Sequence, residues 1–241
     1  SSSVPVSVSG NGREFSIGET SLSFLYAPLP SVKQVYPVSG SVDGGTKVQL
    51  AGSNLDVASS KMSVLCRFGS QTVPAKVISP SQISCVAPPS LSSVSIVSLE
   101  VSTNSGTDFS KSGISFRYSD LAVPTTLLPP AGIEDGGFKV VVVGSGFYST
   151  PTLGCKFGDV FASGTFVSSD RIECTAPPAT SVGAAISVGV TLNGVDYSSQ
   201  ELTFTYTPSV VLSSITPASS PIGSTTTVTV TGENFAVTAG V

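Results

Sequence analysis

The 241-residue sequence contains no histidine and no tryptophan, and only 11% of its residues are charged. Histidine is the commonest general base, the commonest metal ligand and the usual partner of a Ser or Cys nucleophile. A conventional catalytic triad is therefore impossible within this chain, and we expect no enzyme activity. Eleven basic and fifteen acidic residues give a formal net charge of -4, which provides no basic surface for nucleic acid.

Long apolar stretches are missing as well. The longest runs, such as Val140–Val143, are far shorter than the roughly 18 residues that span a bilayer. The first residues, Ser1–Pro5, lack the basic start and the apolar core of a signal peptide, so we expect any secretion signal to have been removed or to lie outside this chain. No membrane contact is expected for this segment.

Glycine and proline, by contrast, are frequent, with 24 and 17 positions. Ser, Thr and Val are also abundant, whereas the Glu, Lys, Arg and Gln that cover helix surfaces are scarce. This composition is typical of short strands separated by turns. We therefore predict an all-β protein.

Three short motifs recur along the chain at intervals of roughly 90 residues, which is the length of a small domain. A Phe-x-Tyr motif closes a segment at residues 24–26, 116–118 and 204–206. A glycine turn occurs at residues 52–55, 144–147 and 232–235. A Cys-x-Phe-Gly segment followed by Cys-x-Ala-Pro-Pro occurs twice, from Cys66 to Pro89 and from Cys155 to Pro178. The chain is therefore built from repeats.

The repeats predict two complete domains, residues 29–119 and 120–207. Residues 1–27 resemble the C-terminal part of another repeat, and residues 208–241 resemble the N-terminal part of a further one. Short strands with frequent turns over this length predict tandem immunoglobulin-like β-sandwiches. We expect six recurring aromatic side chains to fill the cores: Phe68, Phe116, Tyr118, Phe157, Phe204 and Tyr206.

Two local patterns give more detailed expectations. The apolar run Phe138–Val143 is uniform enough to be buried on both faces of its strand. The Asn193–Gly194 pair, between two strand patterns, predicts a type I′ hairpin turn.

The repeats resemble the IPT/TIG family of immunoglobulin-like domains, which occurs in plexins, fibrocystin-like proteins and microbial surface proteins. In the first copy the resemblance rests on a Pro-x-x-Gly-x-x-Asp-Gly-Gly-Thr start and the two cysteine segments, at Pro37, Gly40, Asp43, Gly44, Gly45, Thr46, Cys66 and Cys85. In the second copy it rests on Asp135, Gly136, Gly137, Gly144, Cys155, Phe157, Gly158, Cys174, Pro177 and Pro178. The resemblance covers nearly the whole chain and implies a fold more firmly than a function.

Acidic residues at the recurring turn offer too few ligands for calcium. Asp43 in the first copy, and Glu134 with Asp135 in the second, supply one or two carboxylates where calcium takes six to eight oxygen ligands. We expect these to be solvated turns, and we expect no metal and no cofactor.

The four cysteines are spaced equally in the two copies, which favours the disulfides Cys66–Cys85 and Cys155–Cys174. Free buried thiols are the alternative, whereas zinc is a poorer one because two cysteines without histidine do not complete a tetrahedral site. Disulfides would place the protein in an oxidising compartment, extracellular or at the cell surface.

Three functions remain open for such an array. The first is a structural stalk, spacer or filament subunit, in which proline-rich connectors at residues 26–30, 123–130 and 207–208 restrict the angles between domains. The second is a ligand-binding or adhesive ectodomain, with variable loops at residues 56–62 and 147–153; an accessory role beside an enzyme is also open. The expected partners are neighbouring repeats, other copies of the chain, or a protein or glycan ligand, but not nucleic acid.

Overall fold

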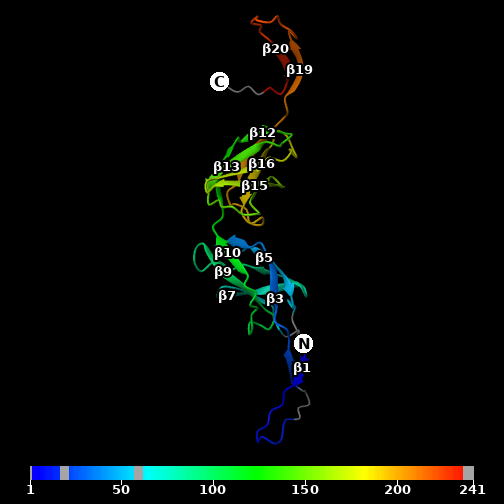
Figure 1. Cartoon of the computed structure of the whole chain (residues 1–241), viewed down its shortest axis with the longest axis vertical. Coiled ribbons are helices and arrows are strands. Elements are labelled where there is room, and N and C mark those ends of the chain that lie inside the picture. Colours follow the sequence, from blue (N-terminus) through cyan, green and yellow to red (C-terminus); the bar gives the residue numbers. More distant parts are fainter. Residues whose placement is uncertain (1, 17–21, 57–61, 236–241) are drawn as a thin grey trace. The chain divides into compact units, whose positions relative to one another are not determined.

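The computed structural model describes residues 2–16, 22–56 and 62–235, and in this part of the chain every regular element is a β-strand. Figure 1 shows the strands along the chain. They fall into two units, Ser1–Leu121 and Ala122–Val241. None of the described residues forms a helix long and apolar enough to cross a membrane. The prediction of an all-β fold made of immunoglobulin-like sandwiches is confirmed.

The sandwich of the first unit contains eight strands whose hydrogen-bonded order is β3-β5-β8-β7-β6-β9-β10-β4. Their bounds are β3 (Ser31–Tyr36), β4 (Ser39–Ser41), β5 (Lys47–Ser53), β6 (Leu65–Phe68), β7 (Gln71–Ser79), β8 (Gln82–Val86), β9 (Ser95–Ser102) and β10 (Ser115–Ser119). Strand β7 joins the two layers, because residues 75–79 pair with β8 and residues 71–74 pair with β6.

The sandwich of the second unit repeats this order as β11-β13-β16-β15-β14-β17-β18-β12. Its strands are β11 (Val123–Leu128), β12 (Ala131–Ile133), β13 (Lys139–Ser145), β14 (Gly154–Phe157), β15 (Val160–Ser168), β16 (Arg171–Thr175), β17 (Ala185–Thr191) and β18 (Leu202–Thr207). Strand β15 changes layers as β7 does, because it pairs with both β14 and β16. The two copies therefore share one topology.

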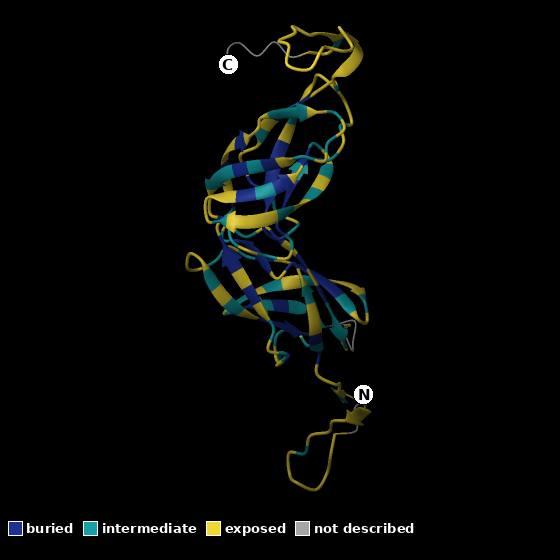
Figure 2. Ribbon diagram, turned by 45° about the horizontal axis from the view of Figure 1, so that its top comes forward, coloured by how far each residue is buried: buried dark blue, intermediate teal, exposed yellow. Residues whose placement is uncertain are grey.

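A two-stranded hairpin lies near each end of the chain. Strands β1 (Ser2–Pro5) and β2 (Ser23–Tyr26) pair antiparallel, as do β19 (Val211–Thr216) and β20 (Thr229–Glu233). Figure 2 shows that both hairpins are exposed, whereas buried residues are confined to the two sandwiches.

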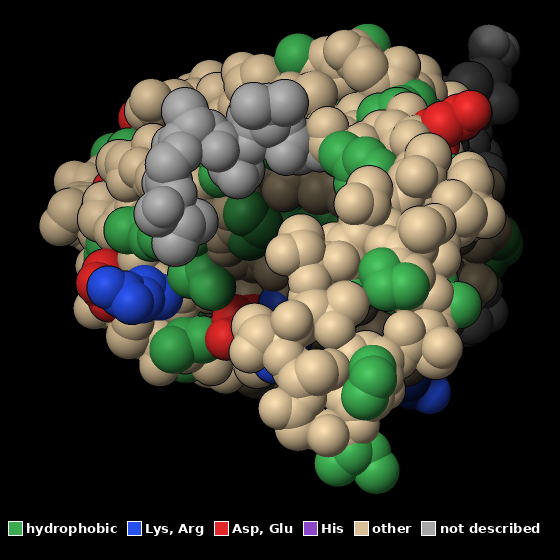
Figure 3. All heavy atoms as spheres, turned by 90° about the horizontal axis from the view of Figure 1, so that it is seen from above, with side chains coloured by type: hydrophobic (Ala, Val, Ile, Leu, Met, Phe, Trp, Pro, Cys, Tyr) green, Lys and Arg blue, Asp and Glu red, His purple; other side chains and the backbone are tan. Residues whose placement is uncertain are grey.

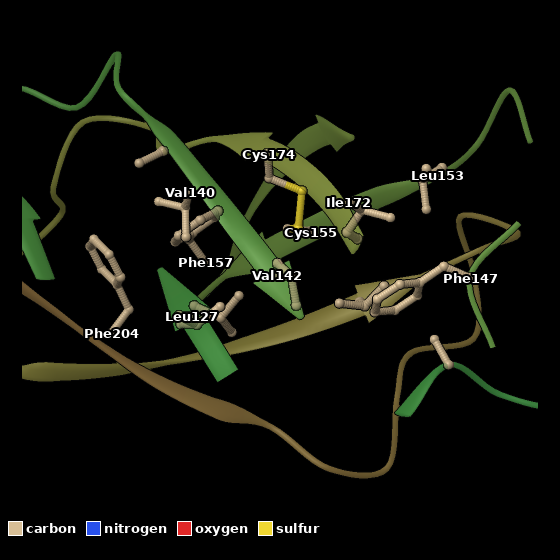
Figure 4. Close-up of a cluster of buried hydrophobic side chains, with 14 of the residues drawn as sticks. Leu127, Val140, Val142, Phe147, Leu153, Cys155, Phe157, Ile172, Cys174 and Phe204 are labelled. Atoms are coloured by element: carbon tan, nitrogen blue, oxygen red, sulfur yellow. A yellow bond between two sulfur atoms is a disulfide. The ribbon is translucent and has the colours of Figure 1, made fainter. Parts of the chain in front are cut away.

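Each sandwich is filled by the aromatic residues that recur in the sequence. Phe68, Phe116 and Tyr118 are at most 1% exposed, and neighbouring rings meet edge to face. Their counterparts Phe157, Phe204 and Tyr206 pack in the same way in the second unit, whose core is drawn in Figure 4. The prediction that these six residues form the cores is confirmed. Such edge-to-face pairs add to the stabilisation that comes from burying the rings.

The apolar run of β13 is buried on one face rather than on both. Val140 and Val142 are fully buried, whereas Val141 and Val143 are only partly covered. The outer layer of a sandwich faces solvent, so an alternating pattern of burial is expected even when every residue is valine. The expectation of burial on both faces was wrong.

The Asp-Gly-Gly turn needs glycine because it packs against the Ala-Pro-Pro segment. Gly44 has φ 76°, and a Cβ there would lie 2.6 Å from the backbone nitrogen of Pro89. Gly136 has φ 66°, and a Cβ there would lie 2.5 Å from the carbonyl carbon of Pro177. Any larger residue would collide with backbone and adopt a strained conformation. The Asp-Gly-Gly turn and the Ala-Pro-Pro segment, which are far apart in sequence, thus pack directly against each other.

Two expectations about connections were wrong. A type I′ turn requires positive φ at both central residues, but only Gly194 of the Asn193–Gly194 pair has it, and β18 begins only at Leu202. The proline-rich stretch 123–130 is not a connector either, since residues 123–128 form β11 and are part of the second sandwich. The connection between the two sandwiches is residues 120–122.

Candidate functional site

The four cysteines lie in the two cores. Cys66 of β6 and Cys85 of β8 form a disulfide, and Cys155 of β14 forms one with Cys174 of β16. Each bond crosses from one layer of its sandwich to the other, and all four residues are at most 1% exposed. Figure 4 shows the second disulfide among the side chains of the core. The bonds therefore stabilise the fold and are shielded from solvent.

In each sandwich, the tyrosine of the Phe-x-Tyr motif donates a hydrogen bond to the Pro-Pro segment. The hydroxyl of Tyr118 donates to the carbonyl of Pro88 at 2.9 Å, and that of Tyr206 donates to the carbonyl of Pro177 at 2.5 Å. Burial raises the pKa of Tyr118 to about 12 and also raises the pKa of Tyr206. Because an ionised phenol cannot donate, both contacts require the neutral form.

The chain contains a recurring element, here called the asparagine loop, of which the sequence predicted only a hairpin turn at Asn193–Gly194. It comprises residues 9–16, 102–110 and 191–198. In each copy an asparagine Oδ1 accepts a hydrogen bond from a backbone N–H a few positions further on. The amide nitrogen of the same residue donates to a carboxylate, in the pairs Asn11–Glu14, Asn104–Asp108 and Asn193–Asp196.

A serine closes each asparagine loop. Its hydroxyl accepts a hydrogen bond from a backbone N–H before the loop, in the pairs Val8–Ser16, Val101–Ser110 and Val190–Ser198. In the sequence, each loop has an asparagine and, a few positions later, an acidic residue. An aromatic residue and a serine follow that acidic residue directly. This signal is visible only when the three copies are aligned on that serine.

The acidic turn of the second unit binds its own chain. The Oε1 atom of Glu134 accepts a hydrogen bond from the backbone N–H of Ser209 at 3.1 Å, and the Ser209 hydroxyl donates to Asp135 at 2.7 Å. In the first unit the backbone N–H of Asp43 donates to Ser41. Over the described ranges, no three acidic or cysteine side chains gather in a way that could hold a metal ion.

The two variable loops differ in what the structure describes. Most of the loop 56–62 lies outside the described residues. In the loop 147–153, Phe147 and Leu153 are buried in the core. Thr152 donates to the carbonyl of Leu192 at 2.9 Å, and Thr150 donates to the same oxygen. This second loop is a packed part of the sandwich rather than a free binding loop.

The surface is poor in charge, and the face in Figure 3 shows hydrophobic side chains scattered among polar ones. A shallow hollow of about 140 Å³ lies on the outer face of β3, β5 and β8 in the first unit. Its polar lining comes from Gln34, Tyr36, Gln49 and Gln82. The Gln82 amide donates to Gln49 at 3.4 Å, and Tyr36 is half exposed. Strand pairing places Thr126, Leu128, Val141 and Arg171 at the corresponding positions of the second unit.

Comparisons with known proteins found the following similarities. Fibrocystin-L of Mus musculus is 28% identical over 221 residues, which is 89% of this chain and 5% of that protein. Plexin-A3 of Homo sapiens is 24% identical over 215 residues, which is 86% of this chain and 11% of that protein. Among solved structures, the extracellular region of plexin A4 matches 78% of this chain and 16% of its own, with 21% identity and a TM-score of 0.49. The chain thus spans a small part of each relative.

The match to a family model covers most of the sequence. The model of the IPT/TIG domain matches residues 30–118, 122–206 and 210–241. The first two ranges coincide with the two sandwiches, and the third contains the hairpin β19–β20. The resemblance noted in the sequence is therefore confirmed, and the chain belongs to the IPT/TIG domain family.

Proposed function

We propose that this chain is a non-catalytic extracellular module, in which tandem IPT/TIG repeats act as a semi-rigid stalk or spacer of a surface or secreted protein. The interiors of the two sandwiches support this proposal, since their polar contacts, disulfides and aromatic clusters all serve to hold the fold together. The disulfides also support an extracellular location, because such bonds persist mainly in oxidising compartments.

The observation that carries the proposal is the shortness of the connections between repeats. Strand β10 ends at Ser119 and β11 begins at Val123, while β18 ends at Thr207 and β19 begins at Val211. Within the first connection, Ala122 is only 4% exposed and belongs to the core of the second unit. A connector this short, with part of its length packed into a domain, leaves few dihedral angles for independent motion.

Side chains add further anchors to the second connection. Ser209 is bound by Glu134 and Asp135, and its carbonyl accepts a hydrogen bond from Asn234 at 2.9 Å. In the first unit, Asn54 donates to the carbonyl of Leu29 in the equivalent way, at 3.2 Å. We therefore expect the orientation of successive repeats to be restricted, which is the property that a spacer needs.

We further propose that the chain contains two complete repeats, residues 29–119 and 120–207, and parts of two more, residues 1–27 and 208–241. The hydrogen bonds of Ser16 with Val8 reproduce those of Ser110 and Ser198 in the complete copies, which supports the assignment of the first segment. The partners would then be neighbouring repeats of the same protein, and contacts between several copies of the chain would build a filament.

The spacer proposal can be tested by measuring the distance distribution between the two units. Lys76 and Thr165 are exposed and equivalent positions on β7 and β15. Replacing both with a ketone-bearing amino acid allows spin labelling while the disulfides stay intact. We expect a narrow distribution by double electron–electron resonance.

The matched control carries a flexible Gly-Ser insert between Asp120 and Leu121, and should give a broad distribution because such inserts behave as random coils. If the unmodified chain gave a distribution as broad as that of the insert, the spacer proposal would be wrong.

A second candidate function, ligand binding by an ectodomain, is supported by the hollow on β3, β5 and β8. Three glutamine amides and the half-exposed ring of Tyr36 can contact a protein or glycan without any need for charge. Nuclear magnetic resonance titrations with neutral oligosaccharides would test this, with Tyr36→Ala as the variant and Leu128→Ala as its control in the second unit. Shifts confined to this hollow, and lost in Tyr36→Ala, would favour binding.

A further inference from the structure

Two asparagine loops contain the same dipeptide, Asn11–Gly12 in the N-terminal hairpin region and Asn193–Gly194 in the second unit. Asparagine is thermolabile in proteins, and a following glycine removes the Cβ that would hinder attack by the next backbone nitrogen. In this reaction the glycine nitrogen loses its proton and forms a bond to Cγ of the asparagine. The Cγ–Nδ2 bond breaks and ammonia leaves. Water then opens the cyclic imide to isoaspartate or aspartate.

The Asn193–Gly194 pair is held in a form that blocks this reaction. The N–H of Gly194, which would supply the nucleophile, donates to Thr191 Oγ1 at 2.9 Å. The asparagine is only 6% exposed. Its Oδ1 accepts from the backbone of Val195 and Asp196, and its Nδ2 donates to the Asp196 carboxylate at 2.8 Å. The contacts of the side-chain amide have counterparts at Asn11, so what distinguishes Asn193 is its burial and the bond that the Gly194 N–H makes to Thr191.

A second set of contacts holds the same loop from outside. Thr150 and Thr152 both donate to the carbonyl of Leu192, the residue that precedes the asparagine. Because the loop 147–153 is anchored in the core by Phe147 and Leu153, rotation of the backbone at Asn193 would also disturb that loop. The Gly194 nitrogen, which is the nucleophile, and the side-chain amide of Asn193, which is the electrophile, are thus both held in place.

The Asn11 side chain makes the same hydrogen bonds as that of Asn193, but the N–H of Gly12 differs from that of Gly194. Across residues 2–16, 22–56 and 62–235, no acceptor for the Gly12 N–H is present. The hydroxyl of Ser9 donates to the Asn11 Oδ1 at 3.2 Å, just as the corresponding hydroxyl of Thr191 donates to the Asn193 Oδ1 at 3.4 Å. The two sites differ in that, among the described residues, only the Thr191 oxygen also accepts from the glycine N–H. Asn11 is exposed, and a Cβ added at Gly12 would meet nothing within 4 Å.

The electrophile at Asn11 remains polarised. Its Oδ1 accepts from the backbone N–H groups of Arg13 at 3.0 Å and Glu14 at 2.9 Å. This oxygen becomes negatively charged when the glycine nitrogen adds to Cγ, and fixed N–H donors stabilise such a charge. The loop therefore favours the addition step, and within the described part of the chain the attacking nitrogen of Gly12 donates no hydrogen bond.

We propose that Asn11 is a site of spontaneous deamidation, and that the Thr191 hydroxyl protects the otherwise similar Asn193. Conversion of Asn11 places a new carboxylate beside Arg13 and Glu14 on an exposed loop. This proposal does not depend on the spacer function, but its consequence is greatest for an extracellular protein that persists for a long time.

The test is incubation of the whole 241-residue chain at mildly alkaline pH, followed by peptide mapping. Deamidation is read from the mass gain of the amide-to-acid exchange, and isoaspartate from methylation by isoaspartyl methyltransferase. We expect Asn11 to convert at least about tenfold faster than Asn193, which corresponds to a barrier difference of about 1.4 kcal/mol. Equal rates at the two sites in the folded chain would overturn the proposal.

Two further measurements separate protection by Thr191 from general effects of folding. In Thr191→Val, which keeps the shape of the side chain but removes the acceptor, we expect Asn193 to convert about tenfold faster. Asn104, which is followed by serine in the first unit, should not change and serves as the internal control. In urea, where the loops are unfolded, Asn11 and Asn193 should convert at similar rates.

An unchanged rate at Asn193 in Thr191→Val would overturn the role of that hydroxyl. Circular dichroism and hydrogen exchange of β14 and β16 check that this variant is folded. If it were unfolded, Thr150→Val combined with Thr152→Val offers a second way to loosen the loop, and a rate at Asn193 unchanged by that pair would also contradict protection by the fold.

Discussion

The two complete repeats have the same interior contacts but differ in how one position of the inner strand is stabilised. In the first repeat, Glu100 of β9 is 8% exposed and accepts hydrogen bonds from the Ser110 hydroxyl and from the backbone of Ser112. In the second repeat the equivalent residue is Gly189 of β17, and a Cβ there would lie 3.7 Å from the ring of Tyr197. A carboxylate network in one copy is thus replaced in the other by a glycine near the ring of Tyr197.

This difference extends to the first strand of the sandwich. The Ser112 hydroxyl, next to Glu100, accepts a hydrogen bond from the backbone of Val32 in β3 at 2.9 Å. In the second repeat, Ser198, which corresponds to Ser110, donates to the carbonyl of Gln200 at 2.8 Å where Ser110 donates to the Glu100 carboxylate. The disulfide, the aromatic cluster and the tyrosine contact occur in both copies and define the fold, whereas the polar contacts around them differ between the copies.

The largest effect should come from breaking a feature that the repeats share, the disulfide. Replacing Cys155 and Cys174 by alanine should lower the free energy of unfolding of the second unit by about 3 kcal/mol, because a loop of this size is no longer closed in the unfolded chain. Replacing Cys66 and Cys85 should cost the first unit a similar amount. Hydrogen exchange measured by mass spectrometry resolves the two units in one experiment.

Each double variant serves as the control for the other. Protection should fall in the unit that has lost its disulfide and stay unchanged in the other unit. A loss of protection across both units in either variant would contradict the view that each repeat has a separate core.

The next largest effect should come from Glu100, the residue at which the two repeats differ. Glu100→Ala should destabilise the first unit by about 2 kcal/mol, because the Ser110 hydroxyl and the Ser112 N–H lose their acceptor in a buried place. Chemical denaturation followed by hydrogen exchange measures the change. Gly189→Ala is the matched control in the second unit, where the added Cβ makes only an ordinary contact. Equal losses in the two variants would show that the network contributes nothing specific.

A smaller effect is expected from alkaline pH through the tyrosine contacts. Folding raises the pKa of Tyr118 from 10.0 to about 12. Its stabilisation is therefore complete below pH 10 and is lost as the pH rises towards 12, because the unfolded chain ionises first. We expect a loss of roughly 1 to 2 kcal/mol, less than the full two units imply, since the hydroxyl is only partly buried.

Tyr118→Phe is the variant that isolates this pH dependence. It removes the hydroxyl and should make the unfolding free energy of the first unit less dependent on pH between 10 and 12. Tyrosinate absorbance during unfolding checks the assignment. If wild type and Tyr118→Phe lost stability in parallel over this range, the alkaline transition would have another cause.

Much of the fold could be predicted from the sequence because the short motifs that determine it are local and occur in both copies. The Phe-x-Tyr motif, the glycine turns and the cysteine spacing each occur in both copies, so any one pattern is checked by the other. Alternation of residue type along β5 then follows from the strand period of two. Agreement between local pattern and overall fold is what made the sandwich and its aromatic core predictable.

The candidate sites could not be predicted in the same way, since they depend on hydrogen bonds rather than on residue type. Nothing in the Asn193–Gly194 dipeptide distinguishes a hairpin turn from a side chain that captures two backbone N–H groups. Likewise, prolines at 124, 129 and 130 suggest a connector, but proline is tolerated on an edge strand such as β11. Both errors arose where side-chain contacts, and not periodicity, decide the structure.

The smallest effect should come from the glycine turn, where the repeats use different residues for one backbone conformation. Asn54 has φ 55°, and its counterpart Gly146 has φ 78°. Asn54→Gly should change the stability of the first unit by less than about 0.5 kcal/mol, because the lost bond to Leu29 is offset by relief of the left-handed conformation. Asn54→Ala should cost about 1 kcal/mol, since alanine gains neither advantage. Gly146→Ala is the control and should cost as much. Thermal unfolding that ranked alanine at position 54 as stable as glycine would mean that this turn relaxes to another conformation.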